Sequence, residues 1–312
     1  MTTRHLLDPE LQPLLELVPT FELDDEHLPQ VRANAATAVD PGDPAQAGVT
    51  REGVHTSGGA GPEVRALLYR PSDKAASGAG YLHIHGGGYV MGTPEMSDPV
   101  NLEICARLGV VVLSIDYRVA PEHPIPAPLD DCYAGLAWLH EQAPALGVDR
   151  NRIGIGGESA GGGLAAALAI KARDAGEYAI CHQHLTYPML DDRTGTPEQP
   201  GDPLVGEFIW TRQSNQYGWR SYLGDAPAEA PQVPARLDDF AGLPPTWMAT
   251  AALDLFRDEN IDYARKLMLA GVRTELVLYP AACHGFQIVP GTYLGAQYAK
   301  DHLHALARAY SH

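Results

Sequence analysis

Basic residues and cysteines are scarce in this 312-residue chain. It has 22 Lys and Arg against 39 Asp and Glu, which gives a formal net charge of −17 at pH 7. A surface of this charge repels nucleic-acid phosphates and anionic lipids, so we expect no nucleic-acid partner and a neutral small-molecule substrate. The four cysteines are far apart and form no C-x-x-C pair, which is typical of a reduced cytoplasmic protein. They are Cys105, Cys132, Cys181 and Cys283.

Long apolar runs are also missing from the chain. None approaches the roughly 20 residues that a membrane-spanning helix requires, so we expect no membrane span. The first residues, MTTRHLLDPELQPLLELVP, include acidic side chains and no extended apolar stretch, so they do not resemble a signal peptide. Together with the cysteine pattern, these absences predict a cytoplasmic location.

What the chain does contain is an alternation of apolar strands and helices. Tyr81–His85 and Val110–Ile115 are continuous apolar runs, typical of central strands buried on both faces. Further strands are expected at Gly53–Thr56 and Val64–Tyr69 (a hairpin), Arg152–Gly156, Ile180–Tyr187, Thr246–Leu253 and Thr274–Tyr279, and helices at Leu129–Gln142, Ala160–Ala175, Asp258–Ala270 and Thr292–Tyr310. This order predicts a single α/β domain with a mostly parallel sheet covered by helices on both faces.

Two segments interrupt this alternation. Residues from about 1 to 45 hold amphipathic pieces, with a helix expected over His5–Val18, and end in a Pro- and Gly-rich linker. Residues 191–244 are rich in Pro, Gly and aromatic side chains. We interpret both segments as a helical lid, and residues 46–190 and 245–312 as the core of the domain.

The pattern Gly157-Glu158-Ser159-Ala160-Gly161 lies between an expected strand and an expected helix. A sharp strand-to-helix turn with small flanking residues points a serine hydroxyl out of the sheet, and it places the following N–H groups at a helix N-terminus. Ser159 is therefore the candidate nucleophile. A chance match in a Gly-rich chain is one alternative. A dinucleotide site is another, but the third glycine of G-x-G-x-x-G would fall on Ser159, and no acidic residue ends the next strand.

Three consecutive glycines, Gly86–Gly88, directly follow the strand at Tyr81–His85. Acyl transfer requires backbone N–H groups aimed at an oxyanion, and glycine allows the closest approach of the backbone. A strand followed by HGGG is the form that this second oxyanion element takes in lipases and esterases. The pairs His83/His85 and His182/His184 suggest metal ligands as an alternative. They lack an acid–histidine partner at ligand spacing, so we expect them to be core or loop-anchoring residues, with no metal.

A serine nucleophile needs an imidazole base and a carboxylate that orients it, in the chain order Ser, acid, His. Asp254 directly follows an expected strand and fits the acid. His284 lies in a loop after the next strand and fits the base, whereas His302 and His304 belong to an expected terminal helix. Cys283 beside the base is expected to be a passive neighbour.

These motifs resemble those of the hormone-sensitive-lipase family of bacterial esterases. His85-Gly-Gly-Gly-Tyr89 resembles the HGGG box of that family, and residues 116–127 (DYRVAPEHPIPA) are similar to its DYRxAPExPxPA signature. LTYPMLD at residues 185–191 and HGF at residues 284–286 also match. The resemblance extends from about residue 65 to residue 290. Two positions depart from the family: Glu158 stands where Asp is more frequent, and the acid motif DLFRDE lacks the usual proline.

The resemblance implies an α/β-hydrolase fold with a lid, activity on short to medium acyl esters without a cofactor, and the homodimer that is frequent in this family. Carried over by position, the oxyanion donors are the N–H groups of Gly87, Gly88 and Ala160. Tyr89, Glu158 and Phe256 are expected to contact the substrate, with Phe256 shaping the acyl pocket.

We therefore expect a serine carboxylesterase with Ser159, His284 and Asp254 as its catalytic triad. Two alternatives remain open. An amidase or formamidase would use the same triad on a different leaving group. A ligand-binding receptor of the same fold would not turn over a substrate, although all three triad residues are present in this chain.

Overall fold

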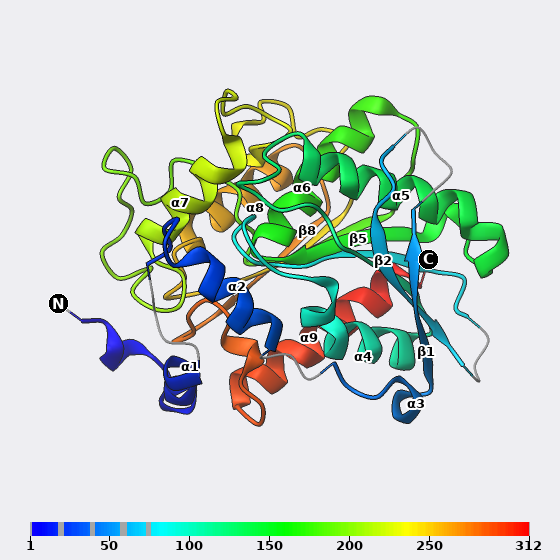
Figure 1. Cartoon of the computed structure of the whole chain (residues 1–312), viewed down its shortest axis with the longest axis horizontal. Helices are drawn as coiled ribbons and strands as arrows, with labels where there is room; N and C mark the ends of the chain where they lie inside the picture. Colours follow the sequence, from blue (N-terminus) through cyan, green and yellow to red (C-terminus); the bar gives the residue numbers. More distant parts are fainter. Residues whose placement is uncertain (1, 18–21, 38–40, 57–60, 73–75, 312) are drawn as a thin grey trace.

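The computed structural model describes residues 2–17, 22–37, 41–56, 61–72 and 76–311 (Figure 1). In this part of the chain, eight strands form one sheet in the order β1-β2-β4-β3-β5-β6-β7-β8. The strands are β1 (Val49–His55), β2 (Arg65–Pro71), β3 (Gly80–Ile84), β4 (Val111–Ile115), β5 (Ile153–Glu158), β6 (His182–Thr186), β7 (Thr246–Ala251) and β8 (Thr274–Tyr279). β2 pairs antiparallel with both β1 and β4, and every other pairing is parallel. This confirms the predicted mostly parallel sheet and its N-terminal hairpin.

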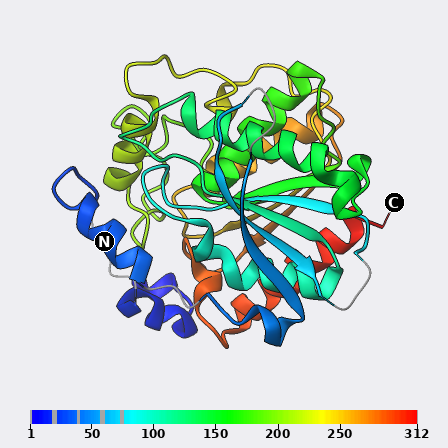
Figure 2. The same cartoon turned by 45° about the vertical axis from the view of Figure 1, so that its right-hand side comes forward.

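Helices cover both faces of the sheet, as predicted (Figures 1 and 2). The helices are α1 (Gln12–Leu17), α2 (Leu28–Thr37), α3 (Pro44–Ala47), α4 (Asp98–Leu108), α5 (Ala127–Leu146), α6 (Ala160–Ala175), α7 (Arg212–Leu223), α8 (Arg257–Leu269) and α9 (Tyr293–Ala309). Side chains of α5, α6 and α8 share one hydrophobic cluster, and side chains of α4 and α9 share another. The two clusters lie on opposite faces and bury the sheet between them. None of the helices in the described ranges is long and apolar enough to cross a membrane.

The N-terminal segment differs from the sequence prediction. Instead of one helix over His5–Val18, two short 3₁₀ turns, Arg4–Leu6 and Pro9–Leu11, precede α1, and Val18 lies outside the described residues. Pro9 explains the break, because proline has no N–H to donate and disfavours a helical conformation in the residue before it. Asp8 instead caps the second turn through its side chain, which accepts a hydrogen bond from the Glu10 N–H.

The N-terminal segment and the 191–244 segment contact each other. The Leu23 N–H donates to Ser214 Oγ at 3.1 Å, and the Tyr217 hydroxyl donates to Asp25 at 2.9 Å. Leu23 and Leu28 are buried in the same hydrophobic cluster as aromatic side chains of the 191–244 segment. These two segments, far apart in the sequence, thus pack against each other.

A group of histidines is buried between β6 and α9. His184 Nε2 and His302 Nδ1 lie 2.8 Å apart, and both rings pack around Trp247. Burial lowers the pKa of His182 and of His302 to about 4, and it holds the pKa of His184 well below its usual value. These imidazoles are therefore neutral in the folded protein at pH 7.

We expect this group to make the fold acid-sensitive. In the unfolded chain a histidine binds a proton near about pH 6.5, whereas in the folded protein His302 binds one only near pH 4. The unfolded state therefore holds more protons between these pH values, and the free energy of unfolding falls as the pH is lowered through this window. The expected loss from His302 is on the order of 2–3 kcal/mol.

Urea unfolding of His302→Gln between pH 7 and pH 4 tests this expectation. The variant should show a smaller loss of stability on acidification than the wild type. His304→Gln is the matched control, because His304 lies on the same helix with an exposed side chain. Equal pH dependence in the His302→Gln variant and the wild type would show that His302 does not resist protonation in the folded state.

Candidate active site

Ser159 lies at the turn from β5 into α6, with backbone angles of φ +56° and ψ −121°. A positive φ is strained for a residue with a Cβ, so the surrounding backbone must hold the turn in place. The two glycines of the motif allow this. A Cβ on Gly157 or on Gly161 would lie 2.1 Å or 2.0 Å from the carbonyl oxygen of Ile84. Only glycine lets β5 and α6 pass this close to the end of β3.

The structure brings together the three residues that the sequence analysis proposed as the triad. His284 Nε2 lies 3.0 Å from Ser159 Oγ, and His284 Nδ1 lies 2.7 Å from Asp254 Oδ2. The three residues follow β5, β7 and β8, so they meet at the carboxyl edge of the parallel strands. Asp254 is buried, and a carboxylate in this position orients the imidazole so that Nε2 faces the hydroxyl.

Local hydrogen bonds position Asp254. Its Oδ1 accepts the N–H of Phe256 at 2.9 Å, which leaves Oδ2 for His284. Arg257 supports the same turn by donating to the Ala252 carbonyl at 3.1 Å. The turn is therefore held by side-chain and backbone contacts at the point where the family motif has a proline and this chain has Leu255.

The glycine loop after β3 reaches the same edge of the sheet. Gly87 and Gly88 have φ values of +124° and +59°, and a Cβ on Gly87 would lie 2.0 Å from the Met91 carbonyl oxygen. Within the described part of the chain, the N–H groups of these two glycines donate to no other protein group. Ala160 begins α6, where the first N–H groups have no acceptor within the helix. These three N–H groups are available to an oxyanion.

Aromatic rings enclose the imidazole of His284. The ring centroids of Tyr187, Phe256 and Trp210 lie 4.4, 5.4 and 6.5 Å from that of His284. From the sequence, Phe256 is expected to shape the acyl pocket, whereas Tyr187 and Trp210 are not singled out. Ser159 and His284 are each only 7% exposed, so these rings and their neighbours nearly close the site.

Two other proposed substrate contacts lie in well-packed surroundings. Tyr89 is fully buried, stacks on Tyr222 at 4.1 Å and donates its hydroxyl to the Met189 carbonyl at 2.8 Å. The Glu158 carboxylate lies 3.1 Å from His83 Nε2. Burial alone would raise the pKa of Glu158, but the charge and hydrogen bond of His83 outweigh it and lower that pKa. Both contacts fit a structural role, in which Tyr89 and Glu158 support the loops around Ser159.

The histidine pairs are placed as core and loop anchors. His85 Nδ1 lies 2.8 Å from the Gly86 carbonyl oxygen, and its ring stacks on Tyr117 at 4.2 Å. Among the residues that the structure describes, no group of three or more His, Cys, Asp or Glu is placed to hold a metal ion. Cys283, beside the base, has its pKa raised to about 12 by burial and by the nearby charge of Asp254. Its thiol is therefore not activated as a nucleophile.

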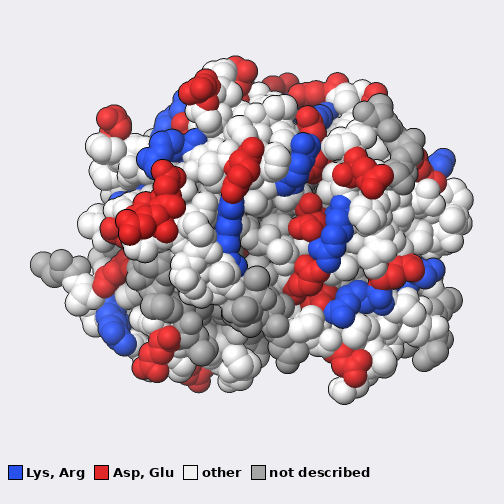
Figure 3. All heavy atoms as spheres, viewed as in Figure 1, with Lys and Arg blue, Asp and Glu red and all other residues white. Residues whose placement is uncertain are grey.

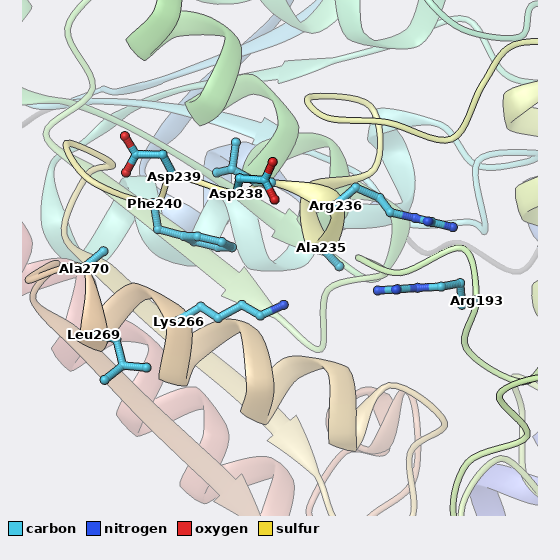
Figure 4. A pocket seen from close by; sticks show the side chains of 10 residues that line it. Arg193, Ala235, Arg236, Asp238, Asp239, Phe240, Lys266, Leu269 and Ala270 are labelled. Carbon is cyan, nitrogen blue, oxygen red and sulfur yellow. The ribbon is translucent and has the colours of Figure 1, made fainter.

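A hollow of about 640 Å³ lies away from the triad, between residues 235–240 and α8 (Figure 4). Three cations line it, but each pairs with its own acid: Arg193 with Asp191, Arg236 with Asp192 and Lys266 with Asp262, at 2.7–2.9 Å. Because the cations are neutralised, the hollow does not offer an anion site, and none of the triad side chains lines it.

Comparisons with known proteins agree with this fold. Residues 81–288 match a family model described as the alpha/beta hydrolase fold. Esterase LipI of Mycobacterium tuberculosis is 33% identical over 285 residues, which cover 90% of this chain and 88% of LipI. Ethyl acetate hydrolase of Pseudomonas putida is 33% identical over 228 residues, 70% of each chain. The solved structure of a bacterial heroin esterase superimposes with a TM-score of 0.90 at 37% identity, with 100% of both chains covered. The chain therefore belongs to the α/β-hydrolase family, among its hormone-sensitive-lipase-like esterases.

Proposed function

We propose that this protein is a serine carboxylesterase that uses Ser159, His284 and Asp254 as its triad. The observation that carries the proposal is the hydrogen-bonded series Asp254–His284–Ser159, with distances of 2.7 Å and 3.0 Å, at the carboxyl edge of the sheet. The unpaired N–H groups of Gly87, Gly88 and Ala160 are placed to stabilise the oxyanion that forms when the serine attacks.

The reaction proceeds through an acyl-enzyme. Ser159 Oγ attacks the ester carbonyl carbon while His284 Nε2 takes the hydroxyl proton, and the carbonyl oxygen becomes an oxyanion held by the N–H groups of Gly87, Gly88 and Ala160. The tetrahedral intermediate then collapses, the C–O bond to the alcohol breaks, and His284 returns the proton to the leaving alkoxide. Water, deprotonated by His284, attacks the acyl-enzyme and releases the carboxylic acid and free Ser159.

The charge of the protein supports a neutral ester as substrate. The net charge is −17, and on the face shown in Figure 3 the Lys and Arg side chains lie beside Asp and Glu rather than in one basic patch. Such a surface also disfavours nucleic acid as a partner. The aromatic rings around His284 make the site apolar, which suits an acyl chain of short to medium length.

We further propose that the chain forms one domain in which the N-terminal segment and residues 191–244 act as a lid. The low exposure of Ser159 supports this, because a movable cover would admit the substrate to a nucleophile that is only 7% exposed. The contacts of Leu23 with Ser214 and of Asp25 with Tyr217 support movement of the two segments as one unit.

A homodimer and a cytoplasmic location complete the proposal. β8 is the last strand of the sheet in the described part of the chain, and Leu278 on it is 46% exposed. At the C-terminal end of α8, Met268 and Leu269 are 51% and 74% exposed, and a second copy would cover these apolar side chains. Light scattering measures the expected dimer mass. The cytoplasmic location is supported by the four cysteines, which are all free thiols.

Matched substrates distinguish an esterase from an amidase. We expect the wild type to hydrolyse p-nitrophenyl butyrate with a kcat/KM at least roughly 10³ times that for the butyryl p-nitroanilide, because the leaving nitrogen of an amide must be protonated by His284 in the step that breaks the bond. Comparable rates for the two substrates would favour the amidase. A receptor would turn over neither substrate, and its Ser159 would not react with an organophosphate such as paraoxon.

A further inference from the structure

Trp210, in the 191–244 segment, packs directly against the glycine loop. A Cβ on Gly88 would lie 2.1 Å from Trp210 Cη2 and within 3.0 Å of two further atoms of the indole. The indole therefore occupies the space that a side chain at position 88 would need. It lies beside one of the N–H groups that are available to the oxyanion, and it is 6% exposed.

The neighbouring residues hold the indole in this place. Trp210 Nε1 donates to Asn215 Oδ1 at 3.2 Å, and the Trp210 N–H donates to the Phe208 carbonyl at 2.7 Å. A Cβ on Gly218 would lie 2.7 Å from the Gly88 carbonyl oxygen and 3.5 Å from Trp210 Cζ2. Gly88 and Gly218 thus form a slot that is free of side chains, and the indole of Trp210 fills it.

The backbone before Trp210 is strained. Ile209 has a φ of +62°, which is a rare conformation for a β-branched residue. Strained residues persist where surrounding contacts determine their conformation, and such positions are concentrated at functional sites. Here the turn at Ile209 directs the next side chain, the indole, toward the oxyanion loop.

The geometry of acyl transfer indicates which part of an ester the indole meets. In the tetrahedral intermediate the oxyanion points to the N–H groups of the glycine loop, the leaving oxygen points to His284 Nε2, and the acyl chain takes the remaining direction. Tyr187 and Phe256 lie closer to the His284 ring, at 4.4 and 5.4 Å, than Trp210 does at 6.5 Å. The indole is therefore the ring farthest from the leaving-group side, and at Gly88 it lies beside the oxyanion loop, where the acyl chain takes the remaining direction.

We propose that Trp210 determines acyl-chain length by closing the acyl side of the site beside Gly88, which makes the protein selective for esters of short acids. This inference rests on the proposed esterase function and refines its substrate class. Trp210 is a specificity-determining residue rather than a catalytic one, since the indole takes no part in bond making or proton transfer.

The test measures kcat/KM for two series of esters with the wild type, Trp210→Ala and Trp210→Phe. The first series is p-nitrophenyl esters from acetate to decanoate, in which only the acyl chain varies. The second is acetate esters of alcohols of increasing length, in which only the leaving group varies. In Trp210→Ala we expect the ratio of octanoate to acetate kcat/KM to rise about tenfold or more, since a single methylene in an apolar pocket already changes discrimination by roughly tenfold.

Trp247→Phe is the matched control, because Trp247 is a buried tryptophan at the opposite end of its strand from the triad, against His184. Its acyl-chain profile should equal that of the wild type. Trp210→Phe should shift the preference in the same direction as Trp210→Ala but less, and it retains an aromatic ring if the alanine variant does not fold.

Three results separate the possibilities. An unchanged acyl-chain profile in a folded Trp210 variant overturns the assignment of Trp210. The proposed esterase function still stands in that case if the wild type hydrolyses the esters. A shift confined to the alcohol series also overturns it, by placing the indole on the leaving-group side. Absence of wild-type turnover of any ester in either series contradicts the proposed function itself.

Discussion

Replacing Ser159 with alanine is expected to lower kcat for p-nitrophenyl butyrate by roughly 10⁶-fold, the loss typical of removing a serine nucleophile. In the proposed mechanism the hydroxyl oxygen forms the acyl-enzyme, and no neighbouring group can replace it. Cys283 is adjacent to the base, but burial and the Asp254 charge raise the pKa of its thiol to about 12. The residual rate should come from the N–H groups of the oxyanion loop and from substrate binding alone.

Two measurements make this prediction specific. Paraoxon should label the wild type at one site per chain and leave Ser159→Ala unlabelled, as read by intact-protein mass spectrometry. Ser221→Ala, a serine on α7 that lies outside the triad, is the control and should keep wild-type turnover. A Ser159→Ala protein that retains more than about one hundredth of wild-type kcat would rule out Ser159 as the nucleophile.

Asp254→Asn is expected to lower kcat by roughly 10⁴-fold with little change in stability. The carboxylate accepts a hydrogen bond from His284 Nδ1–H, which leaves Nε2 unprotonated toward Ser159. An asparagine amide can turn its NH₂ group to Nδ1, and the imidazole then carries its proton on Nε2. In that tautomer the imidazole is unable to take the proton of the serine hydroxyl.

The geometry of the turn makes asparagine a suitable probe. Oδ1 of Asp254 accepts the Phe256 N–H, and an asparagine oxygen can keep this bond. We therefore expect the melting temperature to stay within a few degrees of the wild type. The loss of kcat can then be attributed to the changed tautomer of His284 and not to unfolding. Asp258→Asn is the control, because Asp258 is 56% exposed and pairs with Arg257 at the surface. A kcat for Asp254→Asn within tenfold of the wild type would exclude Asp254 as the residue that orients the base.

The parts of the site that were predictable from the sequence are those that depend on a few consecutive residues. Gly157 and Gly161 flank Ser159 because the strand-to-helix turn leaves no room for a Cβ against the Ile84 carbonyl. The glycines after β3 have positive φ values for a similar reason, since a Cβ on Gly87 would meet the backbone of Met91. Such steric requirements act within a few residues, so they appear in the sequence as glycines at fixed positions of a short motif.

The errors in the secondary-structure prediction also have local causes. Pro9 divides the N-terminal segment into short turns, although the apolar spacing there resembles a helix. α4 was not predicted, because it begins with Asp98-Pro99 directly after a stretch rich in Pro, Gly and Ser and it buries the polar residues Asp98 and Asn101. α6 and β8, in contrast, match the predicted bounds, because Gly176 ends the helix and β8 lies between turns.

The rings that enclose the site left no comparable pattern. Trp210 belongs to a segment of irregular structure, and its contact with Gly88 joins residues more than 100 positions apart. The slot that it fills depends on Gly218, which lies within α7. From the sequence alone, this glycine indicates only a less stable position in a helix. Many aromatic residues in residues 191–244 have similar local surroundings, so the choice among them depends on packing.

The sequence by itself determined the α/β class and the order of the motifs along the chain, and it predicted the nucleophile, base and acid, since each lies in a short motif of neighbouring residues. The tertiary structure alone decided which aromatic side chains surround His284, which polar groups around Tyr89 and Glu158 support the loops, and which indole lies against the oxyanion glycines. The physical reason is that these contacts arise from packing between segments distant in the chain. Their stabilisation depends on shape and burial, which no short pattern of residues records.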